Sequence, residues 1–429
     1  MSVFGKEYSM LPMLRIVLLM SYAVTAGLSI GGCQDARTPE TTATSAPPPA
    51  TAASAVTKKA PTDLEQLAER LVNQSAAIKE GELVLISGGA QDQELLENIA
   101  VHVRKVGAFP QVVLSSDRMA KRLFFDVPEK FDAQADTLGL KLAQNFNVLI
   151  AVNSNLDEGV FAGADPGRQA ARAKTSQPVA EAFLNRKVRQ VEVGNGMYPT
   201  SWRAKRFGMT DDELMKTFWE GVNVDYASLA GRAEEVRGVI AAGNEIQIKD
   251  ANGTDLSVRV QGRPVFASDG IISAEEAQKG GAAISVYLPA GEVYVTPVAG
   301  TAEGKIVRPR EYFQGQEIQN LTLTFAGGKL TSITGSGLGF EPLKALYDAA
   351  GEGKDQFAVV DLGINPNVKL PSSSAVGMWV PAGTVTVGMG NNIWAGGNNK
   401  SAYAYYVSLP GTTVTLDGKP IIENGQLKI

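Results

Sequence analysis

The chain is poor in the side chains that usually carry out hydrolysis. It contains one histidine, His102, and one cysteine, Cys33, in 429 residues. A serine or cysteine nucleophile of the triad type needs an imidazole base beside it, and a catalytic zinc site commonly uses two or three imidazoles. One copy of this chain cannot build a site with two histidines. His102 lies at the margin of the apolar face of a helix expected near residues 92–106, which favours a partly buried structural histidine.

Cys33 ends an N-terminal leader. Arg15 precedes an apolar stretch over residues 16–30, and two glycines come directly before the cysteine. This pattern is typical of a secretory signal, whereas a spanning helix needs about 20 apolar residues. The run Ile30-Gly31-Gly32-Cys33 resembles the lipobox of bacterial lipoproteins. Residues 1–33 are therefore expected to be a signal peptide with lipid attachment at Cys33, and an ordinary secretory leader with an incidental cysteine is the alternative.

Residues 34–62 are expected to form a disordered linker, because they are rich in Pro, Ala, Thr and Ser and contain no aromatic residue. Two acyl chains are enough for stable anchoring. The sequence thus predicts an exported body anchored in the bacterial cell envelope. Gln34 after the cysteine favours the periplasmic side of the outer membrane under the sorting rules of enterobacterial lipoproteins. The net charge of −5 provides no basic footprint for nucleic acid.

The body is expected to have two domains. Over residues 63–242 short strand-like runs alternate with helical segments, which predicts an N-terminal α/β domain with a mostly parallel sheet. Over residues 243–429 short alternating runs are separated by Asn-Gly, Gly-Gly and Asp-Gly turns. They predict a β-rich α+β C-terminal domain of mainly antiparallel strands, with the apolar run 283–288 among them and one helix near 342–350.

The body also carries a series of short motifs rich in glycine and proline. They are, in order, Gly81-Glu82, Pro199-Thr200, Gly208-Met209, Gly253-Thr254-Asp255-Leu256, Pro289-Ala290-Gly291-Glu292-Val293, Gly363-Ile364-Asn365-Pro366, Gly383-Thr384, Gly396-Gly397-Asn398 and Asp417-Gly418. In this order they resemble the aminopeptidase T, or thermophilic-type leucyl aminopeptidase, family. The resemblance implies an aminopeptidase T-like fold and an exopeptidase site in the C-terminal domain, where two divalent metals such as zinc or cobalt activate water.

The resemblance also implies where the metal ligands should lie, and most of them are replaced. Glu292 and Asp361 fall at two carboxylate positions, Asp361 in place of a glutamate. The positions that have lost a ligand are Trp379, Thr386, Ala404 and Tyr406, and a family tyrosine falls at Ile393 or Trp394. No catalytic residue, no metal ligand and no cofactor is therefore expected. Glu292 and Asp361 are interpreted as remnants, and an oxygen-ligand site for Mg²⁺ or Ca²⁺ is the alternative.

Several aromatic residues occur where the family has its metal pocket. Either they fill an emptied site, or Trp394, Tyr403 and Tyr405 line a ligand pocket. The leading hypothesis is a membrane-anchored, catalytically degenerate relative of leucyl aminopeptidase that acts as a binding or structural module, with a peptide or small molecule as its ligand. The alternatives are an active metal-dependent aminopeptidase with an altered ligand set, and an envelope assembly factor without a small ligand. Family analogy leaves a homodimer open.

Overall fold

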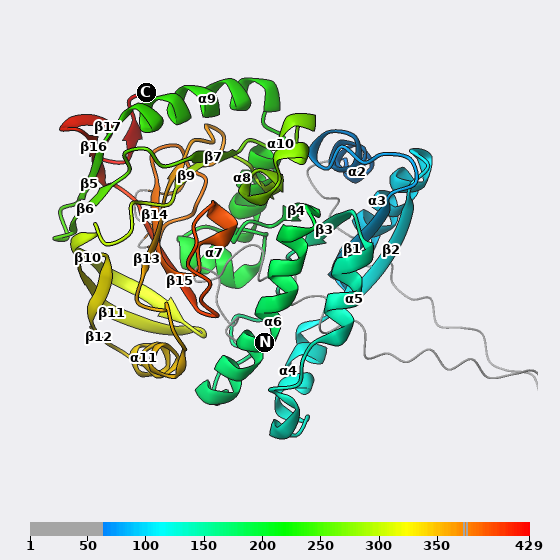
Figure 1. The fold of residues 1–429 in the computed structure, drawn as a ribbon, viewed down its shortest axis with the longest axis horizontal. Coiled ribbons are helices and arrows are strands. Elements are labelled where there is room, and N and C mark those ends of the chain that lie inside the picture. The colour runs from blue at the N-terminus through cyan, green and yellow to red at the C-terminus, as the bar shows by residue number, and fades with distance from the viewer. Residues whose placement is uncertain (1–62, 372–373, 375) are drawn as a thin grey trace, which may run out of the picture.

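The structure is a computed structural model that describes residues 63–371, 374 and 376–429. Cys33, the predicted leader and the predicted linker lie outside these residues. The described residues form three sheets with helices around them (Figure 1). No helix in that part of the chain has the length and apolar character that a membrane span requires.

The first sheet is parallel and has the order β2-β1-β3-β4-β8. Its strands are β1 (Leu83–Gly89), β2 (Phe109–Ser115), β3 (Val148–Val152), β4 (Arg189–Val193) and β8 (Ser285–Leu288). Every residue of β3, β4 and β8 is buried. Parallel strands covered on both faces have such continuous burial. β2 lies at the edge of the sheet and is half exposed.

Helices cover this sheet or connect its strands, and the last of them, α9, packs on β7 (Val265–Ser268) and β9 (Glu292–Val295) instead. They are α2 (Leu64–Arg70), α3 (Gln93–Lys105), α4 (Asp117–Phe125), α5 (Thr137–Asn145), α6 (Pro166–Asn185), α7 (Ser201–Phe207), α8 (Asp211–Val222) and α9 (Tyr226–Ala242). Side-chain caps start most of them. In α8, for example, Thr210 and Glu213 form a reciprocal capping box. His102 of α3 is buried and lies 2.8 Å from Glu65 Oε1 of α2. The only histidine of the chain thus joins two helices of its first half.

The other two sheets contain only antiparallel pairings. One has the order β12-β11-β10-β6-β5-β16-β17-β18 and the other the order β15-β14-β13-β9-β7. The first comprises β5 (Glu245–Lys249), β6 (Asp255–Arg259), β10 (Glu303–Phe313), β11 (Gln316–Ala326), β12 (Lys329–Ser336), β16 (Thr413–Leu416), β17 (Lys419–Glu423) and β18 (Gln426–Leu427). The second comprises β7 (Val265–Ser268), β9 (Glu292–Val295), β13 (Phe357–Gly363), β14 (Val385–Gly390) and β15 (Ala404–Leu409). Two further helices, α10 (Ala274–Lys279) and α11 (Phe340–Ala349), lie in this half of the chain.

The predicted fold class is confirmed, with one strand placed differently. The apolar run 283–288, expected among the antiparallel strands, contains the end of a 3-10 helix and then β8, which pairs in parallel with β4. A strand from the second half of the chain therefore completes the sheet of the first half. The division at residue 242 stays a prediction.

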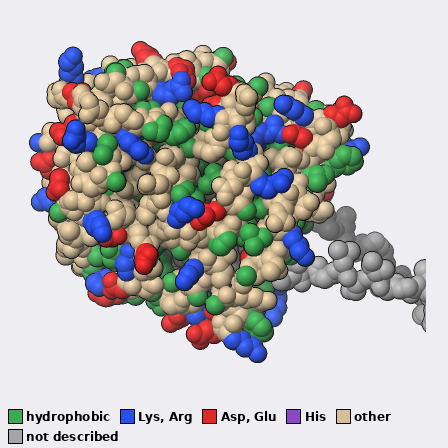
Figure 2. Space-filling view, viewed as in Figure 1, with side chains coloured by type: hydrophobic (Ala, Val, Ile, Leu, Met, Phe, Trp, Pro, Cys, Tyr) green, Lys and Arg blue, Asp and Glu red, His purple; other side chains and the backbone are tan. Residues whose placement is uncertain are grey.

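The five-stranded antiparallel sheet lies in the middle of the molecule. Figure 1 shows β13, β14 and β15 between the parallel sheet and the long β10–β11–β12 meander, with α9 along one side. On the face shown in Figure 2, Lys and Arg side chains are interspersed with Asp and Glu. That face shows no single-sign patch of the kind that nucleic acid would require.

Candidate functional site

The candidate site is one face of the sheet β15-β14-β13-β9-β7. Asp361 on β13 lies opposite Tyr294 on β9 and Thr386 on β14. Directly paired residues share a face, and so do residues two apart on one strand. The register therefore brings five sequence-predicted positions to this face, namely Glu292, Asp361, Thr386, Ala404 and Tyr406. We call it the remnant face.

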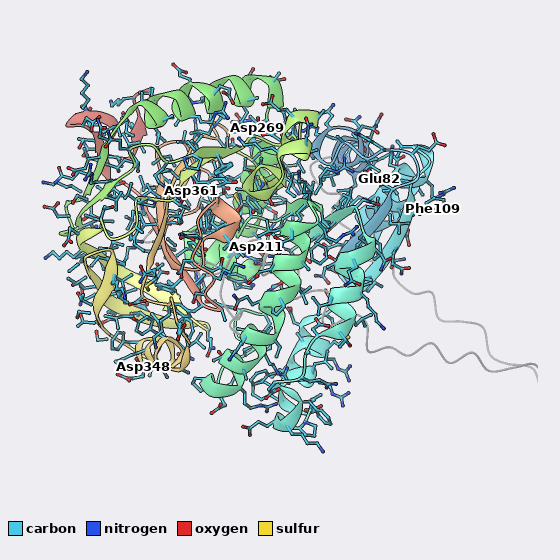
Figure 3. The ribbon with its side chains drawn as sticks, in the orientation of Figure 1. Glu82, Phe109, Asp211, Asp269, Asp348 and Asp361 are labelled. Atoms are coloured by element: carbon cyan, nitrogen blue, oxygen red, sulfur yellow. The ribbon has the colours of Figure 1, made fainter. Side chains whose placement is uncertain are left out.

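The two carboxylates of the remnant face are buried. Asn195 Nδ2 donates to Glu292 Oε1 at 2.7 Å. Asp361 is 1% exposed, and neither of its carboxylate oxygens has a hydrogen-bond partner among the residues that the structure describes. Figure 3 shows Asp361 inside the molecule. Burial, with the negative charge of Glu292 as the second cause, raises the pKa of Asp361 well above its ordinary value. Asp361 is thus a neutral acid over much of the pH range in which an ordinary aspartate is charged.

Aromatic side chains fill the space next to these carboxylates. Trp394 Nε1 donates to Tyr406 Oη at 2.9 Å. The Trp394 ring lies 5.2 Å from that of Tyr294 and 6.3 Å from that of Tyr287, and Trp379 lies 5.1 Å from Tyr406. All five rings are buried. These centroid distances are those of packed aromatic pairs, so the rings form a core on the remnant face.

Tyr403 and Tyr405 lie elsewhere. Because side chains alternate along β15, both point away from the remnant face. Tyr403 packs edge-on against Tyr347 of α11, at 5.7 Å between ring centroids. Burial raises the pKa of Tyr405, and Glu311 of β10 adds to this effect. The structure therefore does not bring Trp394, Tyr403 and Tyr405 together around one pocket.

Sequence reasoning missed Asn195, the partner of Glu292. This residue follows β4 in a Gly-Asn-Gly turn, in which Gly194, Asn195 and Gly196 all have positive φ. Asparagine is one of the few residues with a side chain that adopts this conformation readily. The Gly-Asn-Gly run directly after a buried strand was the available signal. Nothing in the local sequence indicated that its amide would reach a carboxylate nearly one hundred residues away.

The geometry can be compared with known proteins. The sequence profile of the thermophilic metalloprotease (M29) family matches residues 60–349. The chain belongs to this family. The match includes Glu292 and ends before Asp361, Thr386 and Tyr406. No curated protein matches the chain.

Two solved structures share the fold. Wild-type AmpT from Thermus thermophilus has a TM-score of 0.64 and 18% sequence identity, over 85% of this chain and 99% of that chain. The 2,5-dihydroxypyridine dioxygenase from Pseudomonas putida KT2440 has a TM-score of 0.52 and 15% identity, over 85% and 96%. The predicted resemblance to the aminopeptidase T family is thus confirmed. The second structure carries the name of an oxygenase, so the fold by itself does not decide the chemistry.

The expectation of no cofactor is contradicted by family membership. M29 is a family of metalloproteases, so the activity of the family depends on metal. The expectation was drawn from missing ligands, which describe one site and not the family. The side chains of this face nevertheless do not fit a two-metal centre. No group of three or more His, Cys, Asp or Glu residues suited to a metal exists in the part of the chain that the structure describes. We derive no catalytic step through metals here.

The raised pKa of Asp361 gives a testable pH dependence. An unfolded aspartate has a pKa near 3.9, so above about pH 4 the native state binds more protons than the unfolded state, and the free energy of unfolding falls as pH rises. Asp361→Asn removes this dependence. As pH rises from 4 to 8, the free energy of unfolding of the variant should increase relative to that of the wild type by roughly 1–3 kcal/mol.

Urea unfolding at several pH values measures this difference. Asp269, whose pKa burial raises to about 6, is present in both proteins and cancels in the comparison. The control is Glu352→Gln, which removes an exposed carboxylate outside the remnant face. Parallel stability curves for wild type and Asp361→Asn would contradict the assignment of a protonated Asp361.

Proposed function

We propose that the chain is a membrane-anchored lipoprotein of the M29 family that has lost the peptidase chemistry and acts as a binding or structural module. The observation that carries the proposal is the packing of Trp394 against Tyr406 and Tyr294 on the remnant face. A two-metal hydrolase needs room there for two cations, a water and a peptide bond.

The polar groups of the remnant face support the same proposal. Thr386 stands at a family histidine position, and its hydroxyl lies 2.8 Å from that of Ser408. Tyr406 stands at a family aspartate position and accepts a hydrogen bond from Trp394. Both hydroxyls are thus engaged within the protein, and a neutral phenol or alcohol is a weak ligand for zinc compared with imidazole or carboxylate.

The alternative is an active aminopeptidase with an altered ligand set. One observation favours it: the oxygens of Asp361 lack hydrogen-bond partners and face the same side of the sheet as Glu292. Oxygen ligands from two carboxylates, backbone carbonyls and water suit Mg²⁺ or Ca²⁺. The two proposals differ in whether the protein hydrolyses aminoacyl bonds.

Hydrolysis of leucyl and other aminoacyl reporters by the detergent-solubilised lipoprotein tests the proposal. With added zinc or cobalt, we expect no turnover above the rate without protein, because most of the expected ligand positions carry no metal-binding group. Thermus thermophilus AmpT, assayed in parallel, checks that the conditions support catalysis.

The metal content of the same preparation separates the remaining outcomes. If turnover is observed and is lost on chelation and in Glu292→Ala, but not in the exposed Glu275→Ala, the protein is an active peptidase and the proposed loss of peptidase chemistry is wrong. A stoichiometric divalent ion without turnover would support the proposed loss of peptidase chemistry. It would also assign Glu292 and Asp361 to an oxygen-ligand metal site.

The anchor is a separate part of the proposal. It rests on the basic residue, the short apolar segment and the Gly31-Gly32-Cys33 run of the leader. A diacylated Cys33 with the following linker would hold the body at the periplasmic side of the outer membrane.

A further inference from the structure

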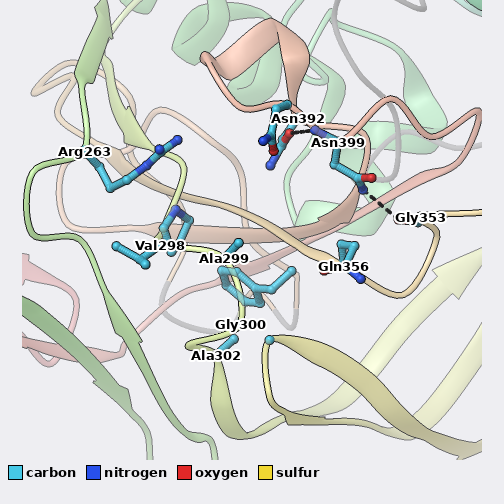
Figure 4. Close-up of a pocket in the computed structure, with 13 residues that line it drawn as sticks. Arg263, Val298, Ala299, Gly300, Ala302, Gly353, Gln356, Asn392 and Asn399 are labelled. Atoms are coloured by element: carbon cyan, nitrogen blue, oxygen red, sulfur yellow. Dashed lines mark hydrogen bonds between the residues drawn. The ribbon is translucent and has the colours of Figure 1, made fainter.

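A second candidate site is a polar pocket of about 350 Å³, which is comparable to small ligand sites in proteins. Five loops contribute to it: the β6–β7 loop with Arg263, the segment after β9 with residues 297–300, the β11–β12 turn with Gly328, the α11–β13 loop with Gly353 and Gln356, and the β14–β15 loop with Asn392 and Asn399 (Figure 4). None of the residues that form the remnant face lines this pocket.

Arg263 supplies an oriented positive charge. Its Nε donates to the carbonyl oxygen of Thr296 at 2.7 Å, and its Nη2 donates to Thr296 Oγ1 at 2.6 Å. These two bonds fix the plane of the guanidinium. Nη1 makes no hydrogen bond, and the guanidinium forms no ion pair, with any residue the structure describes. No Asp or Glu lines the pocket. The charge of Arg263 is therefore not neutralised by the pocket wall.

The opposite wall is held by asparagine amides. Asn392 Oδ1 accepts from the backbone N–H of Asn399 at 2.8 Å. Asn399 Nδ2 donates to the carbonyls of Gly353 and Gly390, each at 2.7 Å. In Figure 4, Arg263 points in from one side, and Asn392 and Asn399 lie across from it. These bonds fix the loop in place, so the pocket is largely formed before any ligand arrives.

Two other amides remain available for a ligand. Gln356 and the exposed Asn398 are among the residues that line the pocket, and their side chains make no hydrogen bond within the described part of the chain. Each amide offers both a donor and an acceptor, which matches the C=O and N–H of a peptide group. The wall thus combines one unneutralised guanidinium with two free amides.

We propose that this pocket binds the carboxylate end of a short peptide. The carboxylate would pair with Arg263, since charge-assisted bonds of arginine to carboxylate are among the strongest polar contacts. The amides of Gln356 and Asn398 would meet the preceding peptide group. A phosphate dianion would leave one negative charge unpaired, because Arg263 is the only charged residue of the lining. The inference goes beyond the proposed function and holds whether or not the remnant face is catalytic.

Binding of N-acetyl-Ala-Ala-Ala to the full-length lipoprotein in detergent, followed by ligand-observed NMR or calorimetry, tests the inference. The acetyl group blocks the N-terminus, so an aminopeptidase cannot consume the probe, and binding is measured separately from turnover. We expect saturable binding of the free acid and at least about tenfold weaker binding of its C-terminal amide. Inorganic phosphate should not compete at equal concentration.

Variants locate the binding. Arg263→Gln should weaken it at least about tenfold, and Asn398→Ala by a few-fold, because each removes a polar group that the proposal assigns to the ligand. Arg259→Gln, at an exposed arginine nearby, is the matched control and should bind as the wild type does. Arg263→Gln also removes the hydrogen bonds to Thr296 and could prevent folding. In that case Asn398→Ala, which breaks no internal hydrogen bond, tests the site.

Each contrary outcome overturns the inference. Absence of binding, equal binding of the acid and the amide, or equal losses in Arg263→Gln and Arg259→Gln would exclude carboxylate recognition by Arg263. Competition by phosphate as strong as that by the peptide acid would show a general anion site instead. An unchanged affinity in a folded Asn398→Ala variant would exclude the contact with the peptide group.

Discussion

Trp394→Ala is expected to lower the free energy of unfolding by about 3–5 kcal/mol, which is the usual cost of removing a buried aromatic ring. Trp394 is 1% exposed and contacts three other buried rings on the remnant face. Its removal would open a cavity among the buried rings of the remnant face. Chemical unfolding of the variant and the wild type measures the loss.

Trp394→Phe is the matched control. It keeps a ring in place and removes the hydrogen bond from Nε1 to Tyr406 Oη, so a cost of about 1–2 kcal/mol is expected. If these rings instead lined a ligand pocket, Trp394→Ala would change stability little and would change ligand binding. A loss below about 1 kcal/mol in Trp394→Ala would therefore contradict a filled remnant face.

Cys33→Ser is expected to abolish acylation, so the body should appear as a soluble or an uncleaved form. A serine hydroxyl cannot form the thioether that carries the lipid, and the remaining linker has no apolar segment to hold a membrane. Incorporation of labelled palmitate, gel mobility and the distribution between membrane and soluble fractions measure the effect.

Ser45→Ala, a substitution in the predicted linker, should leave labelling and fractionation unchanged. Equal palmitate labelling, the same mobility and equal membrane retention in Cys33→Ser and the wild type would contradict lipid attachment at this residue. An unlabelled but still exported wild type would favour the ordinary secretory leader.

Much of the fold could be predicted from the sequence because its signals are local. The run NVLIAV indicates β3, and the apolar spacing in residues 95–103 indicates α3. β8 could not be assigned to the parallel sheet, because a short apolar run does not specify which distant strand it pairs with.

The candidate site was predictable to the same extent. The order of the motifs predicted that Glu292, Asp361, Thr386 and Tyr406 belong to one site, and the strand register places them on one face of the sheet. The packing could not be predicted, because it depends on Tyr287, which comes from β8 and enters the remnant face only through the parallel sheet. The pocket around Arg263 was also missed, since the loops that form it are distant in sequence and only Asn398 falls within a recognised motif.

The placement of β8 has a consequence for how this protein could change during evolution. Without β8, strand β4, whose five residues are all buried, would become an open edge of the parallel sheet and a site for aggregation. The half that carries the remnant face therefore cannot be deleted without harming the half that precedes it. Selection for solubility alone would then retain the C-terminal region, whatever chemistry the remnant face carries out.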